Sequence, residues 1–140
     1  AGKPLQGAFF RLRTGPSRIH RFGVFAEEEI GAGERIIGYT GERVSRRRWA
    51  PRTEGRTYLL RLNAYWAIDG SAGGSGAELI NHCCTPNCEF HFAGEEVWIR
   101  SLRRIAAGEE LLLDYNFSKR AAPTACYCGA AACRGTINRK

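Results

Sequence analysis

A cluster of three thiols lies within eight residues near the C-terminus, formed by Cys126, Cys128 and Cys133. Thiolates at such spacing are typical ligands of a structural zinc ion, which takes four ligands in a closed tetrahedron. The tail offers only three cysteines, so a fourth ligand must come from the rest of the chain, and we expect it to be Cys84. Four thiolates leave no position for water, so this zinc would be structural and not catalytic.

The placement of the other cysteines favours a metal over disulfides. All six cysteines follow His82, whereas residues 1–82 contain none and are still regularly patterned. A secreted disulfide framework would be loop-rich throughout, so a metal in a reducing compartment fits better. Cys88 and His91 are the alternatives for the fourth ligand. Free buried thiols are the remaining interpretation, because cysteine is among the most buried residue types.

Two polar pairs follow apolar segments, Asn81-His82 after Leu79-Ile80 and Asp114-Tyr115 after Leu111–Leu113. A buried amide or imidazole needs hydrogen-bond partners, which either a polar ligand or the backbone can supply. A tyrosine after an apolar strand is usually a core residue with its hydroxyl hydrogen-bonded. Neither pair identifies a reaction by itself.

The elements that position these residues are expected to be short strands in a mostly β domain. We expect a helix that begins at Ser45 and ends at Trp49, a flexible loop over 70–76, a helical turn over 77–81 and a hairpin turn at Gly94. The expected strands cover residues 8–13, 23–26, 35–39, 57–62, 65–68, 89–92, 97–100 and 111–113.

Length and composition indicate one globular domain, with 140 residues of which 44% are hydrophobic. The net charge is +7, and nearly all of the basic charge is arginine. A basic surface favours acidic partners such as nucleic acid, although a solvated arginine-rich surface explains the charge equally well. No apolar run approaches the roughly 20 residues needed to span a bilayer, so no membrane contact is expected. No signal peptide is recognised at the N-terminus.

Six segments in order resemble the SET-domain family of protein-lysine methyltransferases. Residues 19–26 resemble the family's Gly-x-Gly-Val/Leu-Phe-Ala segment, residues 37–42 its Tyr-x-Gly-Glu strand, and residues 58–62 the strand lining its lysine channel. Residues 81–87 resemble Asn-His-Ser-Cys-x-Pro-Asn, residues 108–115 resemble Gly-Glu-Glu-Leu-x-Phe/Tyr-Asp-Tyr, and residues 126–138 resemble the post-SET tail.

The resemblance implies a fold of several small, mostly antiparallel sheets with a knot-like threading near the C-terminus. That threading would bring Asn81, His82 and Tyr115 together. The implied organisation is a SET domain over 1–117 without a pre-SET region, a linker over 118–125 and a zinc-binding post-SET tail over 126–140.

The implied reaction transfers methyl from S-adenosylmethionine to a lysine ε-amine, with histones as the expected substrate class. Tyr115 would be the catalytic tyrosine, and Tyr58 would help to form the lysine channel. The implied zinc ligands are Cys84, Cys126, Cys128 and Cys133. The implied cofactor contacts are His20, Arg21, Phe22, Gly23, Tyr58, Asn81, His82, Tyr115, Tyr127 and Ile137.

Four positions depart from the family's pattern. Arg21 replaces its first glycine, Cys83 a usual serine and Glu78 a frequent arginine. Leu113 occupies the position of a Phe or Tyr, where a tyrosine restricts the family's product to monomethyl lysine. An apolar residue there permits more, so the sequence allows di- or trimethylation.

Two other functions remain as alternatives, a catalytically silent peptide-binding module and a zinc-dependent nucleic-acid-binding domain. The run Arg46–Arg48 could contact nucleosomal DNA weakly, although a solvated face is the preferred interpretation. The expected location is intracellular, in the nucleus or chromatin of a eukaryotic cell or host, or in the cytoplasm of a bacterium. The oligomeric state is left open.

Overall fold

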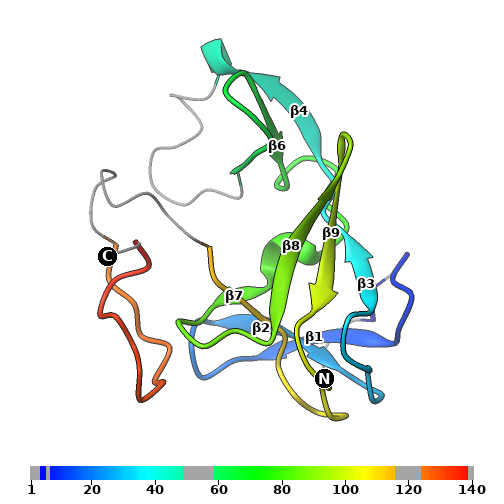
Figure 1. Ribbon diagram of the computed structural model, residues 1–140, viewed down its shortest axis with the longest axis vertical. Coiled ribbons are helices and arrows are strands. Elements are labelled where there is room, and N and C mark those ends of the chain that lie inside the picture. Colours follow the sequence, from blue (N-terminus) through cyan, green and yellow to red (C-terminus); the bar gives the residue numbers. More distant parts are fainter. Residues whose placement is uncertain (1–3, 6, 49–58, 116–123, 139–140) are drawn as a thin grey trace.

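A two-stranded sheet forms the N-terminal part of the computed structural model, which describes residues 4–5, 7–48, 59–115 and 124–138. Strand β1 (Leu12–Pro16) pairs antiparallel with β2 (Phe22–Ala26), and Gly15 lies opposite Gly23. The sheet of β1 and β2 lies beside the five-stranded sheet (Figure 1), and its buried residues Leu12, Val24 and Ala26 belong to the common hydrophobic core. In the described part of the chain no helix has both the length and the apolar character to cross a bilayer.

A five-stranded sheet follows, in the order β3-β9-β8-β10-β7. Strands β8 and β9 form the antiparallel hairpin expected around Gly94, whose φ of 63° allows the tight turn. The short strand β10 lies between β7 and β8 and runs parallel to both. The bounds are β3 Arg35–Gly38, β7 Asn81–His82, β8 Cys88–Ala93, β9 Glu96–Ser101 and β10 Leu112–Leu113.

A third sheet has the antiparallel order β4-β6-β5. Its bounds are β4 Glu42–Ser45, β5 Leu59–Arg61 and β6 Trp66–Asp69. The described helices are two single 3₁₀ turns, η1 (Arg46–Arg48) and η3 (Ala77–Leu79). The predicted mostly β fold with several small sheets is therefore confirmed.

The core lies where the five-stranded sheet meets the strands β1 and β2 and the turn η3. Each buried aliphatic side chain there contributes roughly 1.5–3 kcal/mol relative to exposure. Its largest fully buried members include Leu12, Val24, Ile36, Ile37, Ile80, Ile99, Ile105, Leu111 and Leu113. Ile80 precedes Asn81, and Leu113 precedes Asp114-Tyr115, so core packing fixes the backbone beside both polar pairs.

Three local expectations were wrong or incomplete. The first strand covers Leu12–Pro16 and not residues 8–13, because Phe9 leaves the sheet and stacks on Trp98, with ring centroids 5.6 Å apart. The helix expected after Ser45 is only the turn Arg46–Arg48, and Trp49 and Tyr58 lie outside the described residues. The strands β4 and β7 were not predicted.

Candidate active site and cysteine cluster

The pairing of β7 with β10 builds the centre of the candidate site. Leu112 lies opposite Asn81 and Leu113 opposite His82, and the Cys83 N–H donates to the Leu113 carbonyl at 2.9 Å. Both Asn81 and His82 are buried, at 6% and 4% exposure. The sheet thus places the two polar pairs side by side, as the resemblance implied.

The Asn81 amide is oriented by acceptors on every side of its nitrogen. Its two N–H protons are shared among four acceptors, which are the Glu110 carboxylate at 2.9 Å, the Phe22 carbonyl at 3.0 Å, Ser17 Oγ at 3.1 Å and the His20 carbonyl at 3.5 Å. Ser17 donates its own proton to the same carboxylate at 2.9 Å. Because carbonyls and carboxylates only accept, the nitrogen must face them.

Gly23 is the residue that allows this arrangement. A Cβ at this position would lie 2.1 Å from Glu110 Oε2 and 3.0 Å from Asn81 Nδ2. Any side chain there would push Glu110 away from Ser17 and Asn81. Close packing, and not a positive φ, therefore favours glycine at this position.

His82 of β7 and Tyr115, which follows β10, are in direct contact. The Tyr115 N–H donates to His82 Nδ1 at 3.0 Å, and the Tyr115 hydroxyl donates to the Ile80 carbonyl at 2.5 Å. The two rings lie edge to face with centroids 5.3 Å apart. Burial holds the pKa of His82 below its ordinary value, opposed by Asp114 and assisted by Arg134. The imidazole is accordingly neutral, with Nδ1 as an acceptor and the proton on Nε2.

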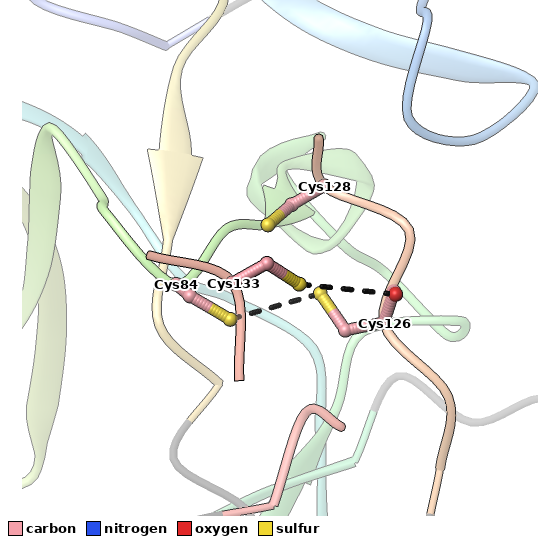
Figure 2. Close-up of side chains that lie close together, drawn as sticks. All are labelled: Cys84, Cys126, Cys128 and Cys133. Atoms are coloured by element: carbon pink, nitrogen blue, oxygen red, sulfur yellow. Dashed lines mark hydrogen bonds between the residues drawn. The ribbon is translucent and has the colours of Figure 1, made fainter. Parts of the chain in front are cut away.

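The four sulfurs of Cys84, Cys126, Cys128 and Cys133 lie within 4.8 Å of one another (Figure 2). The Cys84 and Cys126 sulfurs are 3.8 Å apart. Four sulfurs bound about 2.3 Å from one zinc ion would be separated by about 3.8 Å, so the donor set fits zinc. Of the two rival ligands, Cys88 is buried in the core and His91 lies on β8 opposite Trp98, and neither belongs to this group.

Hydrogen bonds favour the thiolate at Cys128, whereas desolvation raises the pKa of Cys84 and Cys126. Desolvation raises the pKa of Cys126 to about 12. At Cys128 desolvation acts in the same direction, but backbone N–H groups of Cys84 and Ala130, together with neighbouring thiols, outweigh it and lower the pKa to about 6. The backbone N–H groups of Arg134 and Gly135 donate to the sulfurs of Cys84 and Cys133 at 3.3 and 3.4 Å.

The remaining residues of the implied site are less closely grouped. His20 and Arg21 are exposed, and the rings of Phe22 and Tyr127 are 61% and 78% exposed. Ile137 is half-buried, and its N–H donates to the Thr124 carbonyl at 2.8 Å. Leu113, in contrast, is 1% exposed within the core.

Sequence reasoning missed Ser17, Glu110 and Arg134 as parts of the site. Glu110 and Arg134 lie inside two of the recognised segments, Gly-Glu-Glu and Cys-Arg-Gly, which was the available signal. Ser17 contacts Glu110 across 93 positions of sequence, and no local pattern reveals such a contact.

A model of the SET domain matches residues 21–116 of this chain. The chain belongs to the SET-domain family. The SET segment includes Asn81, His82 and Tyr115, and the cysteine tail lies beyond it.

Curated relatives extend the similarity over most of the chain. Histone-lysine N-methyltransferase SETD1A of Homo sapiens is 36% identical over 139 residues, which are 91% of this chain and 8% of that protein. The H3 lysine-4 specific histone-lysine N-methyltransferase of Schizosaccharomyces pombe is 39% identical over 140 residues, 91% of this chain and 15% of its own length. The enzyme of the same name from Saccharomyces cerevisiae is 37% identical over 136 residues, which are 87% of this chain and 13% of that protein. This chain therefore spans only a small part of these relatives.

Proposed function

We propose that this SET domain transfers a methyl group from S-adenosylmethionine to the ε-amine of a histone lysine. The observation that carries the proposal is the contact of His82 with Tyr115, beside the oriented Asn81 amide. Relatives named histone-lysine N-methyltransferases support the reaction class, and two of those names specify H3 lysine 4. Histone H3 is accordingly the first substrate to test.

Tyr115 would act on the lysine amine. The attacking amine must be neutral, although free lysine has a pKa of about 10.4, and burial in an apolar channel lowers it. Because the Tyr115 hydroxyl proton is donated to the Ile80 carbonyl, the hydroxyl oxygen faces incoming groups as an acceptor. An acceptor there can orient the amine N–H, and alignment alone contributes much of the rate. The proposed channel wall Tyr58 lies outside the described residues.

S-adenosylmethionine would supply an electrophilic sulfonium methyl. Asn81, His82 and the backbone of residues 20–23 would hold it, and the absence of a side chain at Gly23 leaves room for the contact of Glu110 with the Asn81 amide. The exposed rings of Phe22 and Tyr127 provide aromatic faces for an adenine. Ile137 would add apolar contact from the tail.

A structural zinc ion held by Cys84, Cys126, Cys128 and Cys133 would fix the tail to the domain. The sulfur separations support this assignment. The proposed division is a SET domain over 1–117, a linker over 118–125 and a post-SET tail over 126–140. The tail would then close the cofactor site, because its residues Tyr127 and Ile137 belong to the same zinc-stapled segment.

Location and secondary partners follow from the proposed substrate. A histone methyltransferase acts in the nucleus on chromatin. The exposed side chains of Arg46 and Arg47 offer positive charge for weak contact with nucleic acid. Such a contact would weaken steeply with salt.

The experiment that tests the proposal is mass spectrometry of core histones incubated with S-adenosylmethionine, using wild-type protein beside Tyr115→Phe. We expect mass shifts of one to three methyl groups on a lysine of H3, which Tyr115→Phe abolishes or greatly reduces. Tyr65→Phe, at an exposed tyrosine between β5 and β6, is the matched control. Cofactor binding without any methylated lysine would instead indicate a silent binding module.

A further inference from the structure

Arg134 of the cysteine tail forms a two-pronged ion pair with the residue that precedes Tyr115. Its Nη1 donates to Asp114 Oδ2 at 2.8 Å and its Nη2 to Asp114 Oδ1 at 3.1 Å. Nη2 also donates to the Ile137 carbonyl at 2.7 Å. The side chains are 19% and 30% exposed, so the pair is better shielded than an ordinary surface salt bridge. Paired hydrogen bonds of this kind fix orientation as well as distance.

The backbone of Arg134 simultaneously contacts the cysteine cluster. Its N–H donates to Cys84 Sγ at 3.3 Å. The same sulfur lies 3.6 Å from His82 Nε2, and His82 Nδ1 lies 3.6 Å from Asp114 Oδ1. Hydrogen bonds therefore link Cys84, Arg134 and Asp114, and His82 lies beside both Cys84 and Asp114. His82 Nδ1 accepts from the N–H of Tyr115, the residue after Asp114.

Charge explains why a guanidinium suits this position. Four thiolates around one zinc ion carry a net charge of −2, and the Asp114 carboxylate adds another negative charge nearby. Arg134 is the cation between them, and its planar fork matches a carboxylate better than a lysine ammonium does. Removing it would leave Asp114 next to the negative cluster without its guanidinium, so the carboxylate would turn away and move the adjoining Tyr115 backbone.

We propose that Arg134 is a positioning residue that couples the docked cysteine tail to the orientation of Tyr115 and His82. The inference rests on the proposed function for its catalytic meaning, but the coupling itself is measurable without methyl transfer. Arg134 is not proposed to contact the substrate or the reacting atoms. It acts through Asp114, which holds the Tyr115 N–H on His82 Nδ1.

The test compares Arg134→Gln, Asp114→Asn and the double variant, made in the whole chain, with Arg100→Gln as control. Arg100 pairs with Glu89 between β8 and β9, away from the site. The readouts are zinc per chain, hydrogen exchange of the Tyr115 amide, and kcat and KM for histone methylation. We expect zinc to stay at about one per chain in each variant, since all four thiols are kept. Tyr115 amide exchange should accelerate about tenfold, the scale of one lost hydrogen bond to a charged group.

The double variant should show nearly the same effect as Arg134→Gln, because the ion pair is already lost in that single variant. Asp114→Asn should show a smaller effect, because it keeps one acceptor oxygen for Arg134. Arg134→Lys should restore the wild-type exchange only in part. The inference would be overturned if Asp114→Asn retained zinc and showed an unchanged exchange rate of the Tyr115 amide. If Arg134→Gln loses zinc, the exchange rate in Asp114→Asn alone tests the inference. If Tyr115 amide exchange is faster in the variants but the wild-type protein does not methylate histone, the coupling is supported and the proposed function is rejected.

Discussion

The backbone N–H of Tyr115 donates a hydrogen bond to Nδ1 of His82 at 3.0 Å, across 33 positions of sequence. This bond assigns the tautomer of a buried histidine, since an N–H donor requires a lone pair on Nδ1. It agrees with the lowered pKa of His82, for which desolvation outweighs the nearby Asp114 carboxylate. His82 therefore positions the backbone of Tyr115 as a neutral acceptor.

Replacing His82 with leucine should destabilise the protein and displace Tyr115. The substitution leaves a buried N–H without its acceptor, which costs about 1–3 kcal/mol. His82→Asn keeps a side-chain acceptor and should cost clearly less. Urea unfolding measures the two losses of stability, and calorimetric titration with S-adenosylmethionine measures binding. Equal losses in both variants would mean that the acceptor at Nδ1 is unimportant.

Gly23→Ala should weaken cofactor binding far more than it weakens folding. Its Cβ would meet Glu110 Oε2 at 2.1 Å, so the carboxylate must leave Ser17 and Asn81. Losing one hydrogen bond to a charged group corresponds to about tenfold in affinity. Gly15→Ala is a matched control, because Gly15 lies directly opposite Gly23 and its added Cβ meets mainly the flexible end of Arg13 at 3.0 Å. Indistinguishable dissociation constants for the two variants would contradict the prediction.

Sequence patterns predicted the parts of this fold whose signals are local. The hairpin of β8 and β9 was recognisable because apolar residues alternate on both sides of Gly94. Strands β4 and β7 were missed because each is short and polar, and their partners lie far along the chain. Asn81-His82 becomes a strand only by pairing with Leu112–Leu113, which no window of a few residues contains.

The same limit applies to the candidate site. The three cysteines of the tail cluster in sequence, so a metal site could be predicted from their spacing alone. Spacing alone did not decide between Cys84 and Cys88, and the physical reason for Cys84 appears only in three dimensions. Cys88 is buried in the core, where it pairs with Leu113 of β10. The contacts of Arg134 with Asp114 and of Ser17 with Glu110 join distant segments and leave no periodic signal.

Zinc content should distinguish the cysteines. Cys84→Ser should reduce bound zinc well below one ion per chain, whereas Cys83→Ser should retain it, because Cys83 hydrogen-bonds with Thr85 and lies outside the four-sulfur group. Elemental analysis after extensive dialysis measures the difference. Cys88→Ser should also retain zinc but lose stability, because it places a hydroxyl in the core. Loss of zinc in Cys88→Ser, with zinc retained in Cys84→Ser, would reverse the ligand assignment.

Removal of zinc by a chelator should free the tail for proteolysis. None of the described tail residues 124–138 belongs to the hydrophobic core cluster, and a structural zinc contributes directly to folding. Limited proteolysis followed by mass spectrometry should then place new cuts within residues 124–138, and added zinc should suppress them. An identical cleavage pattern with and without chelator would show that the tail docks without a metal.

Acid should weaken the contact of Glu109 with Arg103. Hydrogen bonding by Arg103 holds the pKa of Glu109 below its ordinary value of 4.5, so the stabilisation is present above pH 4.5 and is lost as the pH falls through the folded-state pKa. Arg103→Gln should lower the free energy of unfolding at pH 7 by at most about 1 kcal/mol, since the pair is partly exposed. Urea titrations should show this difference shrinking below pH 4.5. A difference that is constant with pH would rule out the Glu109 carboxylate as its source.

Leu113 should set how many methyl groups are added. It is 1% exposed and pairs with both His82 and Cys88, so its side chain occupies a packed site that presents no hydroxyl to the neighbouring Tyr115. Wild-type protein should therefore yield di- or trimethyl lysine after exhaustive reaction. Leu113→Tyr adds bulk and a hydroxyl, and we expect it to shift the product to monomethyl lysine.

The added volume of Leu113→Tyr should also destabilise the core by about 1–3 kcal/mol. Leu112→Tyr provides the control for this effect, because Leu112 is the adjacent, half-buried residue of β10, whose side chain points to the opposite face of the strand. Mass spectrometry of H3 peptides over a time course measures the product distribution of each variant. Monomethyl lysine as the final product of wild-type protein would show that the space around Leu113 does not admit a methylated amine.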